Sequence, residues 1–237
     1  MAEDRDLLVW EAKLAEQAER YDKMLEAMKQ VAALGVMNSE ERQLFSVASK
    51  QTLGRHRSSW RTIFAVEQEE EQKGIAEHIA LVKEYLAREE NSIVTICRSI
   101  IDLMKKQLLI ASTSPEYQVF LYKTKGDHHR FIAEVASTPK LSKESMEEGF
   151  IAYQTGTEIS ADLPPTHPLR LSLALNFAVF YYEILEETEK AIEHAKLAFD
   201  AAIARLDHLN EHEVAETTAI LELLKDNWTL WAEDQNA

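Results

Sequence analysis

The stretch Asn91–Leu108, "NSIVTICRSIIDLMKKQL", decides the fold class of this chain. Its apolar residues recur at steps of three and four positions, which is the spacing that keeps side chains on one face of an α-helix. The stripe consists of Ile93, Ile96, Cys97, Ile100, Leu103, Met104 and Leu108. The same helical period continues almost everywhere along the chain, and no convincing alternating strand lies between turn signals. The sequence therefore predicts an all-α protein.

Capping and breaking residues divide the chain into about nine helical segments. Asn38 followed by Glu41 has the spacing of a capping box at the start of a helix. Pro115, which follows a serine, and Pro168 stand where a proline is expected at the first helical position. No linker rich in glycine or serine separates two halves of the chain. We therefore expect a single domain of antiparallel helices over residues 1–237.

The composition limits the functions open to the chain. Of its 237 residues, 46% are hydrophobic and 28% charged, which is typical of a folded protein. Cys97 is the only cysteine, so no internal disulfide can form and a reducing compartment fits. The net charge of −15 repels phosphate backbones, no apolar stretch approaches the roughly 20 residues that span a bilayer, and the acidic N-terminus is no secretory signal. We expect a cytoplasmic protein, with the nucleus as the alternative, that binds neither nucleic acid nor membrane.

The stretch Lys123–Val135, "KTKGDHHRFIAEV", looks at first like a metal or acid–base site. Successive helical residues project about 100° apart, so His128 and His129 cannot easily hold one ion, and no ligand residue lies three or four positions away from them. The chain also lacks a Gly-rich phosphate loop, a GxSxG elbow and an HExxH motif. We therefore expect no bound metal, no cofactor and no enzymatic activity.

The basic residues are more informative than the histidines. Lys50 and Arg57 are seven positions apart, two helical turns on one face, and Arg61 extends that face. Lys123 and Arg130 repeat the spacing on another helix. Two such helices can converge on a dianion, which arginine grips as a fork while lysine adds point charge. The alternative is that these are ordinary exposed lysines and arginines.

Two further segments carry an asparagine on an otherwise apolar face. In an open groove an asparagine amide could hold a peptide backbone, whereas a leucine or tryptophan on the same face could equally be plain core. The alternative for each asparagine is a hydrogen bond between helices. The residues are Leu175, Asn176, Val179 and Glu183 in the first segment, and Leu223, Asn227, Leu230 and Trp231 in the second.

A helical repeat protein is the rival interpretation. The stretch Asn176–Leu206 has the alanine and tyrosine texture of a tetratricopeptide hairpin. Such folds need about three or more similar units, and only this one is visible. A tetratricopeptide-like scaffold that binds unmodified peptides is therefore the alternative.

Several sequence blocks resemble the 14-3-3 family in the family's order and over essentially the whole chain. The blocks are "AKLAEQAERYDKM", "SVASKQTLGRHRSSWR", "KGDHHRFIAEV", "HPLRLSLALNFAVFYYEIL", "AFDAAIARLDHL" and "LLKDNWTLW". The resemblance implies a cup-shaped protomer of nine helices that works as a dimer and binds phosphoserine or phosphothreonine peptides of client proteins in an amphipathic groove. Residues 1–35 and 39–110 would then form the dimer face and groove floor, and residues 115–237 the groove walls.

The resemblance also implies roles for individual residues. The phosphate would be bound by Lys50, Arg57 and Arg130, with Lys123 and Phe131 beside them. The peptide would be held by Asn176, Asn227, Glu183 and Trp231 and by an apolar wall of Leu175, Val179, Leu223 and Leu230. The interface of a homodimer, or of a heterodimer with another family member, would contain Leu14, Ala18, Arg20, Lys23, Ser59, Ile63, Tyr85 and Arg88.

The chain departs from the family pattern at the phosphate site and the dimer face. Phe131 stands where the family has a tyrosine whose hydroxyl helps to hold the phosphate, and Ser172 replaces a glycine of the groove floor. Lys23 occupies a position that is typically acidic, and its usual partner position holds Arg88; Ser92 replaces a glutamate. A divergent member with weaker phosphate dependence is therefore a second alternative.

The adjacent histidines replace two aromatic residues in the same comparison. If either one reached the anion, its protonation would strengthen peptide binding as the pH falls toward 6.

Overall fold

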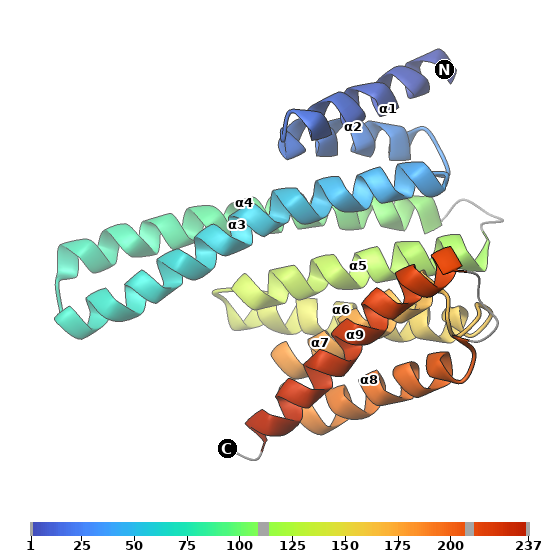
Figure 1. Cartoon of the computed structure of the whole chain (residues 1–237). Coiled ribbons are helices and arrows are strands. Elements are labelled where there is room, and N and C mark those ends of the chain that lie inside the picture. The colour runs from blue at the N-terminus through green and yellow to red at the C-terminus, as the bar shows by residue number, and fades with distance from the viewer. Residues whose placement is uncertain (1, 109–113, 207–210, 236–237) are drawn as a thin grey trace. The chain divides into compact units, whose positions relative to one another are not determined.

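The protein is almost entirely helical (Figure 1). The computed structural model describes residues 2–108, 114–206 and 211–235, and these ranges contain nine α-helices and no β-strand. This confirms the predicted all-α class. None of the helices in these ranges is long and apolar enough to cross a membrane. The helices form two compact units, Met1–Ile110 with Val135–Ser137 and Ala111–Glu134 with Thr138–Ala237. The organisation of the chain as one domain stays a prediction.

The first unit contains four helices. They are α1 (Ala2–Gln17), α2 (Tyr21–Ala33), α3 (Ser39–Lys73) and α4 (Ala76–Leu108). The helices α3 and α4 are the longest of the unit and run side by side (Figure 1). The start of α3 is the predicted capping box, because the Asn38 side chain accepts from the Glu41 backbone while the Glu41 side chain accepts from the Asn38 backbone. Gly74, at φ 72°, ends the helix in the left-handed conformation that glycine adopts without strain.

The apolar stripe that predicted α4 lies in the core of this unit. Ile93, Cys97, Ile100 and Met104 are fully buried, and the core also contains buried methionines and alanines of α2. Arg5 fixes the start of α1. Its Nε and Nη2 donate to the two carboxylate oxygens of the buried Glu41 at 2.7 and 2.6 Å. Such a two-pronged arginine–carboxylate contact is geometrically specific.

The second unit contains the remaining five helices. They are α5 (Pro115–Val135), α6 (Pro139–Ser160), α7 (Pro168–Glu183), α8 (Thr188–Ile203) and α9 (Glu211–Asp234). As predicted, α5 and α7 begin at prolines, whose missing N–H costs nothing at the first helical position. The Ser114 hydroxyl caps α5 by accepting from the Tyr117 backbone at 3.2 Å.

The helix α7 lies at the centre of the second unit. On one side it contributes to a core cluster with α8 and α9, and on another to an aromatic cluster with α5 and α6. Every residue of α7 except Glu183 is at least half-buried. The first cluster is Leu171, Ala178, Ala191, Ala195, Ala202, Leu221, Leu224 and Trp231, and the second is Val119, Tyr153, Leu173, Phe177 and Phe180.

The Tyr153 ring of α6 packs directly against the backbone of Gly126 on α5. A Cβ atom added at Gly126 would lie 2.7 Å from two ring carbons of Tyr153, so the approach needs a residue without a side chain. Because the next residue is Asp127, this contact brings the Tyr153 hydroxyl to the carboxylate described below.

Candidate phosphate and peptide site

A buried carboxylate, that of Asp127 on α5, organises the candidate site in the second unit. Its Oδ1 accepts a hydrogen bond from the Tyr153 hydroxyl at 2.6 Å and another from the Asn176 side-chain amide at 2.7 Å. Its Oδ2 accepts from the Lys123 ammonium at 2.8 Å. One side chain therefore connects α5, α6 and α7 and fixes the positions of two predicted site residues.

The charge states around Asp127 follow from these contacts. Burial alone would raise the pKa of Asp127, but the charges of Lys123 and Arg130 and the hydrogen bonds hold it below the ordinary value. Burial, together with the Asp127 charge, raises the pKa of Tyr153 well above 10. At neutral pH the carboxylate is therefore ionised and the tyrosine is a hydrogen-bond donor.

Arg130 is held at the same site with part of its donor capacity unused. The residue is only 8% exposed, and its Nη1 donates to the Glu183 carboxylate at 3.3 Å. Its guanidinium carbon lies 4.8 Å from the centre of the Phe131 ring, within cation–π range. The Nε atom is buried and has no hydrogen-bond partner among the described residues. Burial opposes the charge, but the neighbouring Tyr153 and Asp127 raise the pKa of Arg130, which stays a cation.

The two histidines face the protein interior. His128 Nδ1 lies 2.6 Å from the backbone oxygen of Thr124, so this nitrogen carries the proton and donates it. Burial lowers the pKa of His128 to about 4. The expectation that His128 adds positive charge near pH 6 is therefore wrong, because the ring stays neutral there. His129 is also buried, and no three potential metal ligands cluster within the described ranges.

The predicted peptide contacts on α7 and α9 differ in exposure. Leu223 and Leu230 are 53% and 55% exposed, so α9 offers apolar surface. Trp231 is buried and stacks on Tyr182 with ring centres 4.9 Å apart, which is how a core residue packs. Asn227 is half-buried. On α7, the leucine and valine of the predicted wall, Leu175 and Val179, pack partly against the core cluster.

The other predicted basic pair belongs to the first unit. Lys50 is exposed and Arg57 half-buried, and both lie on α3. Two helical turns separate them on one face, as the spacing predicts.

Ser172, one of the departures from the family pattern, lies on α7. It donates its hydroxyl proton to the Leu169 backbone oxygen at 3.1 Å.

The predicted dimer residues lie on α1 to α4 of the first unit and, for Ala18 and Arg20, in the turn between α1 and α2. Leu14 and Tyr85 are each 49% exposed, and Ala18 is exposed as well, whereas Ser59 and Ile63 are half-buried. The charged residues of this set have carboxylate partners within the same chain: Arg20 contacts Asp22 at 3.2 Å, Lys23 contacts Glu26 at 2.8 Å, and Arg88 contacts Glu84.

Sequence reasoning missed several residues of the candidate site and of the exposed apolar face of α1. The position of Asp127 four residues after Lys123 was a visible signal for their ion pair. Tyr153, which is 26 residues from Asp127, gave no signal. On α1, Leu7 and Trp10 are 66% and 63% exposed, and their spacing with Leu14 at steps of three and four could have identified a longer apolar face.

Comparison with known proteins gives a match over nearly the whole chain. The family model described as "14-3-3 protein" matches residues 11–232. The 14-3-3 protein epsilon of Drosophila melanogaster is 50% identical over 236 residues, which cover 99% of this chain and 90% of that protein. A 14-3-3-like protein of Chlamydomonas reinhardtii is 49% identical, covering 99% of this chain and 92% of that protein. A 14-3-3-like protein of Solanum tuberosum is 46% identical with the same coverage. These matches do not favour the tetratricopeptide alternative.

Proposed function

Because the chain belongs to the 14-3-3 family, whose members are phosphopeptide-binding adaptors, we propose that Arg130 is the central phosphate ligand of this protein. The observation that carries the proposal is a buried guanidinium with an unused Nε donor and one 3.3 Å contact to a carboxylate. A phosphoserine or phosphothreonine carries about −1.5 to −2 charges and three acceptor oxygens. A phosphate group can therefore accept hydrogen bonds from N–H groups of Arg130 that the single contact to Glu183 does not use.

Asp127 supports the proposed role of Arg130 by holding the neighbouring side chains in position. It fixes Lys123 through an ion pair and Asn176 through its amide, and its negative charge favours the charged form of the buried Arg130. Lys123 and Asn176 are therefore already ordered before the ligand binds, which lowers the entropy cost of binding.

The proposal extends to α3 and α9. Lys50 and Arg57 would complete the cationic shell around the phosphate, because the dianion is not neutralised by one arginine and one lysine that already pairs with Asp127. Asn176 and Asn227 would hold the peptide backbone, while the exposed Leu223 and Leu230 would bury apolar side chains of the client. Glu183, the partner of Arg130, completes the proposed set. Trp231, a predicted peptide contact, is instead buried against Tyr182 in the core.

We also infer that the protein is a dimer and acts without catalysis, by masking, scaffolding or bending its phosphorylated clients in the cytoplasm. The apolar residues Leu14, Ala18 and Tyr85 are exposed on the first unit, and an exposed apolar face of this kind is typical of a protein interface. The second subunit would be another copy of the chain or a related family member.

A titration with matched peptides tests the phosphate assignment. Arg130→Ala removes a charge-assisted contact worth about 1.5–3 kcal/mol, so affinity for a phosphoserine peptide should fall at least roughly tenfold. The unphosphorylated peptide should bind the wild type far more weakly than the phosphorylated one. Lys140→Ala is the matched control, because Lys140 is an exposed cation of α6 with only a distant ion pair at 3.8 Å.

Two outcomes contradict the proposal. Equal affinity of wild type and Arg130→Ala for the phosphopeptide, with the helical circular dichroism preserved, excludes Arg130 as the ligand. Equal binding of the phosphorylated and unphosphorylated peptides excludes phosphate recognition and favours a scaffold of the tetratricopeptide type.

A further inference from the structure

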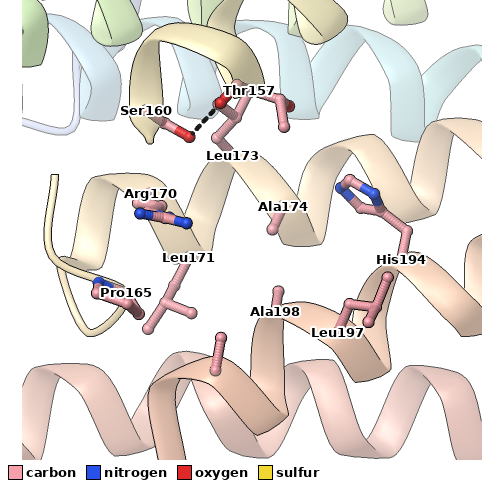
Figure 2. Close-up of a pocket in the computed structure, with 11 residues that line it drawn as sticks. Thr157, Ser160, Pro165, Arg170, Leu171, Leu173, Ala174, His194, Leu197 and Ala198 are labelled. Carbon is pink, nitrogen blue, oxygen red and sulfur yellow. Dashed lines mark hydrogen bonds between the residues drawn. The ribbon is translucent and has the colours of Figure 1, made fainter. Parts of the chain in front are cut away.

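A hollow lies beside α7 in the second unit (Figure 2). It has a volume of about 210 Å³ and is bounded by α6, the loop after it, α7 and α8. Residues of a helix project at 100° intervals, so the pocket residue Ala174 points almost opposite to Asn176 and Glu183. None of the proposed phosphate or peptide contacts is among the described residues that line the hollow, which we therefore treat as a separate site.

The pocket has an arginine with unused donors at one end. Arg170 Nη1 donates to the backbone oxygens of Leu163 at 2.6 Å and Ala161 at 3.4 Å. A guanidinium has five N–H groups, so those on Nε and Nη2 are not needed for these two contacts. No ion pair to Arg170 occurs in the described part of the chain, and no described residue that lines the pocket is acidic. The local environment of Arg170 therefore favours an anion, although the net charge of the chain, −15, opposes one at long range.

The rest of the pocket is largely apolar. Figure 2 shows Ala174 and Ala198 between Arg170 at one end and His194 at the other, with Leu171 below Arg170 and Leu197 below His194. Burial lowers the pKa of His194, so its ring is neutral at physiological pH, and it contacts the aromatic cluster of α7 edge-on. The charge of the pocket is therefore confined to its arginine end.

The small size of the alanine side chains leaves room for a compact molecule. The volume of about 210 Å³ is larger than the roughly 150 Å³ of a cavity that holds benzene and below the roughly 300–1,000 Å³ of pockets for drug-sized ligands, which fits a small molecule. We propose that this pocket binds a small organic carboxylate, with the carboxylate on Arg170 and an apolar body along Leu171, Ala174 and Ala198 toward His194. A guanidinium fork matches a carboxylate, and alanine and leucine methyl groups match an alkyl or aryl body.

Fluorine NMR on the full chain tests this binding directly. The probe is 4-fluorophenylacetate, and 2-(4-fluorophenyl)ethanol is the neutral control with a similar shape. We expect saturable broadening with the carboxylate at one site per chain. The alcohol should bind roughly tenfold more weakly or worse, because it loses a charge-assisted contact to Arg170.

Two pocket variants and one distant variant decide the location. Ala198→Leu fills the cavity while leaving Arg170 in place, and should abolish the broadening. Arg170→Gln should weaken carboxylate binding roughly tenfold without changing binding of the alcohol. Arg130→Ala, which removes the proposed phosphate ligand, should leave carboxylate binding unchanged.

The proposal is overturned by any of three results. These are no saturable broadening up to about 10 mM probe, wild-type binding in Ala198→Leu, or loss of binding in Arg130→Ala, which would move the anion to the peptide site. Because Ala198→Leu removes no hydrogen bond, its result stands even if Arg170→Gln loosens the end of α6.

Discussion

At the scale of single residues, Phe131 lies beside Arg130 and bears on the phosphate binding that we propose. The phenyl ring lies under the guanidinium and edge-on to His128, with ring centres 5.7 Å apart. It can therefore support the cation, but it has no hydroxyl to donate to an anion. Compared with the tyrosine expected at this position, Phe131 therefore lacks one hydrogen-bond donor, while the packing of the helix is unchanged.

Restoring the hydroxyl should strengthen phosphate binding. Phe131→Tyr adds a donor to a charged acceptor, a contact worth about 1.5–3 kcal/mol, so phosphopeptide affinity should rise roughly tenfold. Calorimetry with phosphorylated and unphosphorylated forms of one peptide measures the gain, which should be absent for the unphosphorylated form. If the phosphorylated peptide binds no better, the ring edge does not face the phosphate.

The buried histidines should make the protein sensitive to mild acid. The pKa of His128 is about 4 in the folded protein and near 6.5 in the unfolded chain, so only the unfolded chain takes up a proton between these values. Stability is therefore intact above pH 6.5 and is lost as the pH falls toward 4, by up to about 3 kcal/mol. His194, whose pKa burial also lowers, acts in the same direction.

Urea unfolding between pH 7 and 4.5 measures this loss, and it should be smaller in His128→Gln. Histidine NMR on the folded protein gives an independent check. A His128 ring that titrates near 6.5 in the native state would refute the assignment.

At the scale of elements, the close contact of α5 with α6 should dominate the cost of mutating a glycine. Gly126→Ala places a methyl group against the Tyr153 ring, and overpacking of this kind costs about 1–3 kcal/mol, partly offset by the better helix propensity of alanine. Gly54→Ala is the control: Gly54 lies on α3 with nothing within 4 Å of the added Cβ, so it should stabilise by about 0.5–1 kcal/mol.

Denaturant unfolding of both glycine variants gives the comparison. The two substitutions are chemically identical and both occur in helices, so opposite signs isolate the packing contact. Equal changes in the free energy of unfolding would mean that α5 and α6 are not in close contact at this point.

The elements were predictable where the cause is local. Asn38, Pro115 and Pro168 mark helix starts because capping depends on neighbours within one turn. The Asn176–Asp127 hydrogen bond joins residues 49 positions apart, and no local pattern specifies such a pairing. The neutral state of His128 was missed for the same reason, since burial comes from tertiary packing.

At the scale of the whole molecule, two opposing forces would act on the proposed dimer: attraction between apolar surfaces and repulsion between like charges. Each chain carries a net charge of −15, so two copies repel each other at long range. In the dimer that we propose, the exposed apolar face of α1 would provide the attraction, whereas the charged residues Lys23 and Arg88 already have partners in their own chain and would contribute little. Added salt should therefore strengthen the dimer by screening the repulsion.

Sedimentation of point variants tests the face. Leu14→Asp places a charge on the exposed apolar stripe and should give monomers at low micromolar concentration. Ile151→Asp is the matched control, because Ile151 is a similarly exposed apolar residue on α6 outside the predicted interface, and it should remain dimeric. A wild type that is monomeric at every salt concentration contradicts the dimer.

The central position of α7 has a consequence for synthesis on the ribosome. Nearly every side of this helix is covered, and part of its cover comes from α8 and α9, which follow it in the chain. The end of α9 at Asp234 lies 51 residues beyond the end of α7 at Glu183 (234 minus 183), so translation at about 5–20 residues per second leaves α7 incompletely covered for about 3–10 s. During that interval its leucines and aromatic residues are open to chaperones and to other nascent chains. A chain cut short before α9 would remain in this condition permanently, and would be found in aggregates.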